Sequence, residues 1–189
     1  MVKKFSRRSA SEFSGISSIE YFDFEEDFIE KNIRCIPMIV RFKLDKAGIK
    51  LKLDEWTRLV VDERIELASR PCGTEEETRE YRAYLYHLVR KRSAREATVL
   101  AIDEDPAWAD LNKLPALLND KLRQEDWHIT LKQWRHLTNL QRFALLKLCK
   151  PGHESKNFPK ALREFGLISG LRVFNNEKEE HEIIGYHKD

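Results

Sequence analysis

Apolar residues recur along this chain with the 3.6-residue period of an α-helix, and polar residues fill the positions between them. Thr74, Thr130 and Thr138 each stand three positions before a Glu or Gln, which is the spacing of a helix-capping box. Gly48 and Gly166 follow such segments and suit the left-handed residue that ends a helix. The helix that opens after Thr74 carries on one face Tyr81, Tyr84, Leu85 and Leu88. The pattern predicts an all-α protein.

The helical pattern occurs twice. Residues 36–72 align with residues 114–150 without a gap, at a constant offset of 78 positions. The identical pairs are Pro37/Pro115, Lys43/Lys121, Leu44/Leu122, Leu53/Leu131, Trp56/Trp134, Leu59/Leu137, Arg64/Arg142 and Leu67/Leu145. A unit of this size that is repeated once is too long for a solenoid period. We therefore predict two pseudo-symmetric helical halves from an internal duplication, with the two repeated tryptophans in equivalent buried sites.

The duplication lies within one helical domain, which we place at 21–167. Residues 1–20 are basic and rich in serine, which is typical of a flexible arm. A short helix is expected over about 24–33, and residues 96–113 predict a long ordered loop between the copies. In the segment 168–189 apolar residues alternate around a polar run, so a short C-terminal β-hairpin and a disordered tail both remain open.

The composition of the chain argues against nucleic acid and membranes as its partners. The chain has 34 basic and 32 acidic residues and a net charge of +2, which argues against nucleic acid as the main partner. No apolar run reaches the length of a membrane span, so we expect no membrane partner. The 3 cysteines form no short-spaced pair, which fits a reducing compartment and a cytoplasmic protein.

The sequence contains no phosphate-binding glycine loop, no zinc-protease motif and no nucleophile elbow. We therefore predict that the protein is not an enzyme and has no catalytic residue and no cofactor. The densest polar run, 152–158, has no counterpart in the first copy. His153 and Glu154 could form an acid–base pair or bind a metal, but a turn with Asn157 as the cap of the last helix explains the run equally simply, and we favour it.

The cysteines and a basic stripe are two further candidates. Cys35, Cys72 and Cys149, with or without His153, could bind a metal, and Cys35 with Cys72 could form a redox pair. Small buried apolar positions explain the cysteines as well, and the short ligand spacing of structural zinc is missing, so we predict no metal site. The basic residues over 79–95 are interleaved with glutamates and fit a solvated helix face.

Several separated segments nevertheless resemble one protein family. These segments are 22–25 (FDFE), 34–45 (RCIPMIVRFKLD), 48–53 (GIKLKL), 70–72 (RPC), 140–148 (LQRFALLKL), 151–158 (PGHESKNF) and 164–167 (EFGL). They are similar, in the same order, to the nitrate reductase-associated family of bacteria and cyanobacteria. The resemblance covers about 21–167 and implies a cytoplasmic accessory protein of assimilatory nitrate reduction, linked to production of active nitrate reductase. The family supplies no catalytic residue to carry over.

The resemblance and the missing catalytic motifs together predict a protein-binding factor, either a maturation or a cofactor-insertion chaperone, whose partner is the nitrate reductase apoprotein. We expect its binding surface where the duplication is broken, because unrepeated polar residues gather there. The expected partner-binding residues are Arg34, Arg41, His153, Glu154 and Asn157. The alternative is a redox or metal sensor in nitrate assimilation that uses Cys35 and Cys72.

Overall fold

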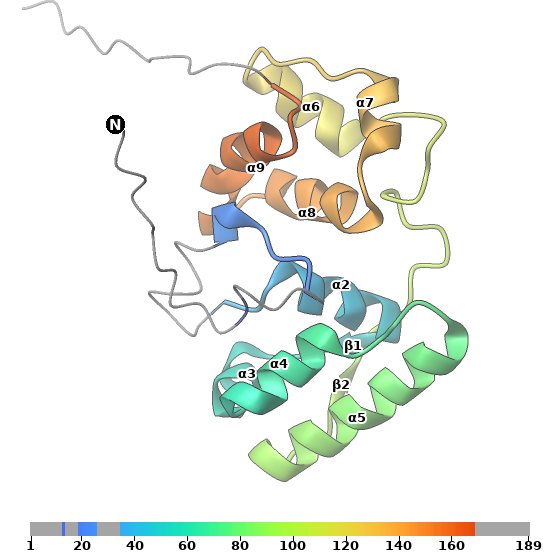
Figure 1. Cartoon of the computed structure of the whole chain (residues 1–189), viewed down its shortest axis with the longest axis vertical. Coiled ribbons are helices and arrows are strands. Elements are labelled where there is room, and N and C mark those ends of the chain that lie inside the picture. Colours follow the sequence, from blue (N-terminus) through green and yellow to red (C-terminus); the bar gives the residue numbers. More distant parts are fainter. Residues whose placement is uncertain (1–12, 14–18, 26–34, 169–189) are drawn as a thin grey trace, which may run out of the picture.

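The computed structural model describes residue 13 and residues 19–25 and 35–168, without the side chains of His153 and Glu154. This part of the chain is mostly helical, which confirms the predicted all-α class (Figure 1). The expected hairpin or tail beyond residue 168 and most of the expected helix over 24–33 lie outside the described residues. Two residues of the expected arm, Phe13 and Ile19, are buried in the core.

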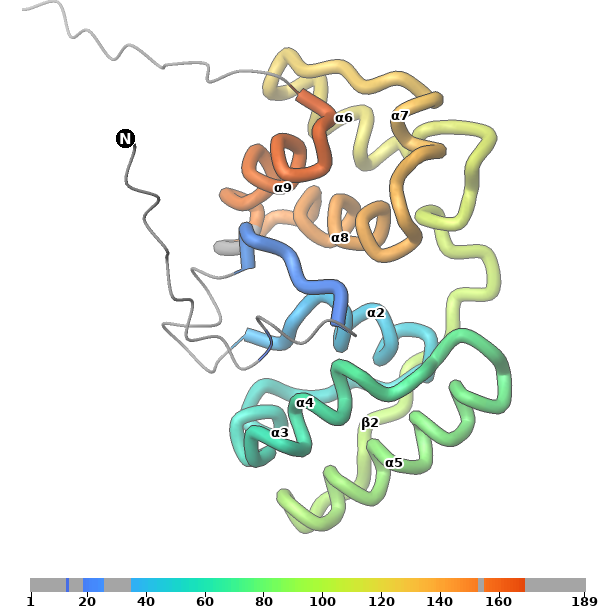
Figure 2. Tube along the Cα trace, in the orientation of Figure 1, coloured from blue at the N-terminus to red at the C-terminus, as the bar shows by residue number. Residues whose placement is uncertain are grey.

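The chain forms two groups of helices that are stacked along the long axis of the molecule (Figure 1). The first half contains α2 (Met38–Ala47), β1 (Ile49–Lys50), α3 (Leu53–Arg58), α4 (Val61–Ser69), α5 (Glu75–Ser93) and β2 (Thr98–Val99). The second half contains α6 (Ala116–Gln124), α7 (Leu131–His136), α8 (Asn139–Cys149), the 3₁₀ helix η2 (His153–Asn157) and α9 (Phe158–Glu164). A short 3₁₀ helix, η1 (Asp23–Glu25), precedes them. The connection 100–115 runs along one side of both halves (Figure 2).

The helices of the two repeated segments begin at corresponding positions. α6, α7 and α8 each start 78 positions after α2, α3 and α4. Gly48, which follows α2, and Asp126, which stands 78 positions later, both have a positive φ, of 63° and 52°. Trp56 and Trp134 are both buried, and each lies 5.8 Å from the guanidinium of its own repeated arginine. A two-fold relation between the halves stays a prediction.

Helix ends follow the chemistry that the sequence indicates. The Oγ1 atoms of Thr74, Thr130 and Thr138 accept hydrogen bonds from backbone N–H groups three residues later, at 3.1–3.2 Å, which confirms the three capping boxes. Pro37 was expected in the first turn of α2, but it stands immediately before that helix. At this position its missing N–H leaves no donor unsatisfied. α5 buries Tyr81, Leu85 and Leu88 as its spacing predicts.

A two-stranded antiparallel sheet was not expected. β1 pairs with β2 in the register Ile49 to Val99, and the N–H of Leu100 donates to the carbonyl of Gly48 at 2.8 Å. The pairing forms because the left-handed turn at Gly48 ends α2 and sends the chain out in an extended conformation beside the start of the connection. The matching residues of the second copy, 127–128, are not in a strand.

The core consists of two apolar clusters, one in each half. α2 lies between them and contacts both α5 and α8, and Ile39 packs against both clusters. Phe24 of η1 and Phe22, which directly precedes η1, belong to the core of the second half, although the next α-helix in the sequence, α2, belongs to the first half. The junction between the halves is therefore built around α2 and η1.

Candidate functional site

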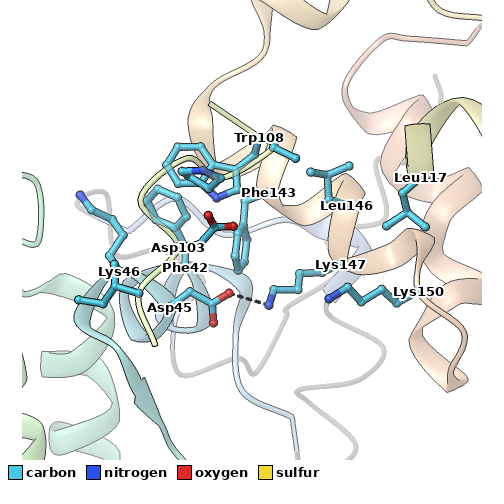
Figure 3. A pocket seen from close by; sticks show the side chains of 13 residues that line it. Phe42, Asp45, Lys46, Asp103, Trp108, Leu117, Phe143, Leu146, Lys147 and Lys150 are labelled. Carbon is cyan, nitrogen blue, oxygen red and sulfur yellow. Dashed lines mark hydrogen bonds and ion pairs between the residues drawn. The ribbon is translucent and has the colours of Figure 1, made fainter. Parts of the chain in front are cut away.

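A pocket of about 380 Å³ opens at the junction between α2, α8 and the connection 100–115 (Figure 3). Both halves contribute to its walls. Its lining residues are Phe42, Asp45, Lys46, Ile102, Asp103, Pro106, Ala107, Trp108, Leu117, Phe143, Leu146, Lys147 and Lys150. Most of this surface is apolar, and the charged groups stand among it, which is the usual composition of a binding cleft.

Three aromatic rings line the pocket. The ring centroid of Phe42 lies 5.1 Å from that of Trp108 and 5.3 Å from that of Phe143, and both pairs meet edge to face. This geometry places the positive edge of one ring against the negative face of another, so it holds the rings in fixed orientations. The aromatic part of the pocket is therefore formed before any partner arrives.

The wall that carries Trp108 is held by side chains of the second copy. Arg142 is buried and donates from Nε to the carbonyl of Trp108 at 2.7 Å. The indole N–H of Trp134 donates to the carbonyl of Asp110 at 2.8 Å, and Arg135 donates to the carbonyl of Leu111 at 2.7 Å. The repeated Trp–Arg pair of the second half thus fixes the connection between the halves in addition to building core.

An ion pair joins the two halves at the pocket. Lys147 of α8 and Asp45 of α2 approach to 2.7 Å, and the Lys147 ammonium also lies 4.9 Å from the ring centroid of Phe143 (Figure 3). Lys46 turns its ammonium to the carbonyl of Cys72 at 2.5 Å. Lys150 is exposed, and no carboxylate within the described part of the chain pairs with it. Among the described residues, this side of the pocket therefore presents the neutralised charge of Lys147 and, directly after the end of α8, the uncompensated charge of Lys150.

Of the residues expected from the sequence to bind a partner, Arg41 and Asn157 have described side chains, and neither lines this pocket. Arg34 lies outside the described residues, and for His153 and Glu154 the structure gives the backbone of η2 alone. Asn157 is 2% exposed, and its side-chain N–H donates to the carbonyl of Phe24 at 3.0 Å. Asn157 stands at the start of α9, as expected, but its side chain does not cap that helix.

Asn157 belongs instead to a polar cluster that anchors η1 between the halves. Glu164 accepts from the N–H groups of Asp23 and Phe24 at 2.8 and 3.0 Å. Glu25 is buried and accepts from the N–H of Met38 at 2.7 Å, at the first turn of α2. Burial raises the pKa of Glu25 to about 8, while its backbone hydrogen bonds and then the charge of Arg41 oppose that rise.

The three cysteines, all among the described residues, form no disulfide with one another. Cys72 is buried at the corner after α4, where its Sγ lies 3.6 Å from Thr78 Oγ1. Burial raises the pKa of the Cys149 thiol to about 12 and so disfavours the reactive thiolate. Among the described residues no three His, Cys, Asp or Glu side chains are grouped as metal ligands. The sensor alternative, which depends on Cys35 and Cys72, stays a prediction.

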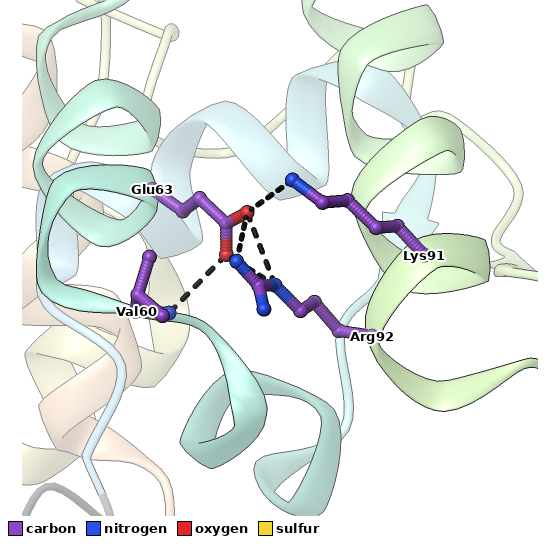
Figure 4. Close-up of polar contacts among 4 residues, drawn as sticks. All are labelled: Val60, Glu63, Lys91 and Arg92. Carbon is purple, nitrogen blue, oxygen red and sulfur yellow. Dashed lines mark hydrogen bonds and ion pairs between the residues drawn. The ribbon is translucent and has the colours of Figure 1, made fainter.

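Part of the basic stripe on α5 is used inside the protein. Glu63, at the start of α4, accepts from Lys91 at 3.1 Å and from Arg92 at 2.8 Å (Figure 4). The hydrogen bonds from Arg92 lower the pKa of Glu63 to about 2. Arg82 donates to the carbonyl of Ala47 at 3.1 Å, at the end of α2. These contacts join α5 to the rest of the first half.

Sequence reasoning missed the pocket because its lining comes from four separate segments. The sequence did contain one indication: the connection 96–113 carries Leu100, Ile102 and Trp108, which is more apolar surface than a solvated loop needs. Ile102 and Leu117 are 43% and 41% exposed. Apolar residues that stay exposed beside an aromatic pocket are a stronger indication of binding than the polar run 152–158.

A family model described as conserved nitrate reductase-associated protein matches residues 21–165. The chain belongs to this family. No curated protein and no solved structure matches it. The family match spans η1 to the end of α9 and therefore includes every element that lines the pocket. Among the described helices, none combines the length and apolar character that a membrane span requires.

The described part of this member of the nitrate reductase-associated family has three structural features. Its two halves are joined through α2, η1 and the Asp45–Lys147 ion pair. Its pocket is lined by aromatic rings in edge-to-face contact and braced by a partly buried hydrogen bond from Arg142. Its most strongly perturbed carboxyl groups, Glu25 and Glu63, are bound within the protein and are not part of the pocket lining.

Proposed function

We propose that this protein is a non-catalytic accessory factor that binds the nitrate reductase apoprotein and supports formation of the active enzyme. The observation that carries the proposal is the family match over residues 21–165. Two further features favour binding. The pocket is apolar with charged groups at its edge, and the strongly shifted carboxyl groups are engaged in structural contacts.

An accessory factor of this kind acts through differential affinity. A protein that binds the apoprotein and not the loaded enzyme shifts the population toward a cofactor-accessible form, and it is released once the cofactor is in place. This task requires a preformed surface of the right shape and charge. It requires no proton transfer and no nucleophile.

The proposal is tested by deleting the gene in its own organism and measuring nitrate reductase activity per reductase polypeptide. We expect the polypeptide to accumulate with a low specific activity, and the activity to return when the gene is supplied on a plasmid. Nitrite reductase activity in the same extracts is the matched control and should not change. A normal ratio of activity to polypeptide in the deletion strain would refute the maturation role.

A further inference from the structure

The opening of the pocket between the halves is bordered by apolar side chains that remain exposed to solvent. Ile102 on the connection and Leu117 on α6 line the pocket beside the aromatic floor, which is formed by the three rings described above. Both residues remain more than two-fifths exposed. Exposed apolar side chains are ordinary when they are scattered, but here they border one cavity. Burying such a mouth against an apolar side chain is favourable by about 25 cal/mol for each Å² removed from water.

The walls of the pocket are held by hydrogen bonds and an ion pair, so little ordering is needed on binding. Arg142 and Trp134 hold the connection by partly buried hydrogen bonds of 2.7 and 2.8 Å. The ion pair between Asp45 and Lys147 holds α2 against α8. A preformed site loses less conformational entropy than a mobile one when it takes up a partner.

The charges around the mouth differ from wall to wall. α8 presents Lys147, which Asp45 neutralises, and the residue directly after α8 is Lys150, which has no acidic partner among the described residues. The connection presents Asp103, and the next two residues are also acidic, Glu104 and Asp105. An occupant that carries a carboxylate is therefore attracted toward α8 and repelled by the connection, which fixes its direction in the pocket.

We propose that this pocket docks a segment of the partner polypeptide in which one large apolar side chain is accompanied by a carboxylate. The apolar side chain enters between the aromatic floor and Leu117, and the carboxylate pairs with Lys150. This inference rests on the proposed function, because the segment belongs to the nitrate reductase apoprotein. It adds where the apoprotein is held and which chemistry is recognised.

The pocket matches this occupant better than it matches a compact anion. A site for a phosphate or a similar ion gathers several uncompensated donors on one point, as an arginine cluster or a helix N-terminus does. Here Lys147 is already paired, Lys46 donates to a backbone carbonyl, and Asp103 stands on the other wall. Among the described residues, the ammonium of Lys150 has no carboxylate partner, and such a charge beside a largely apolar cavity suits a single carboxylate next to an apolar anchor.

The test uses the full chain and fluorescein-labelled 15-residue peptides that tile the nitrate reductase apoprotein, with binding followed by fluorescence polarisation. We expect the bound peptides to share a Leu, Met, Phe or Trp close to an Asp or Glu. Leu117→Ser should weaken their binding about tenfold, through lost apolar contact. Lys150→Glu should weaken it about 5- to 10-fold, and changing the peptide carboxylate to Lys should restore binding to that variant.

Two exposed residues outside the pocket serve as matched controls for Leu117 and Lys150. Leu111 is 40% exposed against 41% for Leu117, but it lies outside the pocket lining, so Leu111→Ser should leave affinity unchanged. Lys132 is exposed on α7, and Lys132→Glu controls for the change in net charge. Circular dichroism melting of each variant checks that the fold is retained.

Three results would overturn the inference, and each differs from failure of the proposed function. Peptides that bind Leu117→Ser and Lys150→Glu as tightly as the parent would place docking elsewhere. Dissociation of a dimer of this chain by Leu117→Ser, seen by sedimentation, would show that a second copy covers the pocket. Intact apoprotein binding that none of the pocket variants weakens would leave the accessory role standing without this site. A normal deletion strain removes the accessory role itself.

Discussion

Arg142 offers the sharpest test of how the junction is held together. Its guanidinium is 5% exposed and donates to the carbonyls of Trp108 and Leu137 at 2.7 and 2.5 Å, and to the side chain of Asn139. Arg142→Met keeps most of the volume and removes the donors. The carbonyls of Trp108 and Leu137 then lose this partner in a largely buried place.

The magnitude follows from the number of bonds that are lost. A hydrogen bond from a charged donor contributes about 1.5–3 kcal/mol, and removal of the buried charge returns part of its desolvation cost. We therefore expect Arg142→Met to lower the free energy of unfolding by about 3–4 kcal/mol. For a chain of this size that loss corresponds to a fall in melting temperature of roughly 10 °C.

Arg135→Met is the matched control. Arg135 makes one hydrogen bond to the same connection, 2.7 Å to the carbonyl of Leu111, but it is exposed, so its loss should cost less than about 1 kcal/mol. Hydrogen exchange gives a second readout at the N–H of Ala109, which donates to Pro106 at 2.7 Å. We expect that amide to lose protection in Arg142→Met and to keep it in the control. Equal melting temperatures for the two variants would refute the anchoring role of Arg142.

Three further predictions concern a turn and two carboxyl groups. Gly48→Ala should cost about 1–3 kcal/mol more than Gly166→Ala, because both have φ above 60° but a Cβ at Gly48 meets Ile102 at 2.8 Å; urea unfolding measures the difference. Glu63, with its pKa lowered to about 2, should stabilise the fold above pH 4.5 and lose that contribution as pH falls toward 2. The melting temperature of Glu63→Gln should therefore fall less than that of the parent between pH 4.5 and pH 2. Glu25, with its pKa raised to about 8, is held neutral at a cost that grows between pH 4.5 and 8, so Glu25→Gln should raise the melting temperature at pH 8 more than at pH 5.

The helical framework was predictable because its determinants are local. The threonine caps, the left-handed Gly48 and the apolar face of α5 depend on residues within one or two turns. The helices start at matching positions of the two repeated segments because the residues that determine each start are local as well. The strand pair was missed because it depends on β2, which lies 49 residues away from β1 in the chain, and two residues carry too little periodicity to indicate a strand.

The candidate site was harder to predict because it forms by convergence of distant segments. Phe42, Trp108 and Phe143 meet only after the halves have packed, and no spacing along the chain relates them. Asn157 was expected at a partner-binding surface, yet it is buried; Glu25, within another of the family-like segments, is buried too and its pKa is raised to about 8. Polar residues in a recognisable motif can serve the packing of a short segment such as η1, and sequence alone does not separate that role from binding.

The central claim is that this protein holds nitrate reductase before the enzyme is complete. The most direct measurement is isothermal titration of the purified chain into cofactor-free nitrate reductase and, separately, into the fully loaded enzyme at the same salt concentration. We predict a saturable complex with the apoprotein and binding to the loaded enzyme that is at least about tenfold weaker, a difference of about 1.4 kcal/mol. Equal affinity for the two forms, or no heat with the apoprotein at concentrations in the tens of micromolar, would contradict the account.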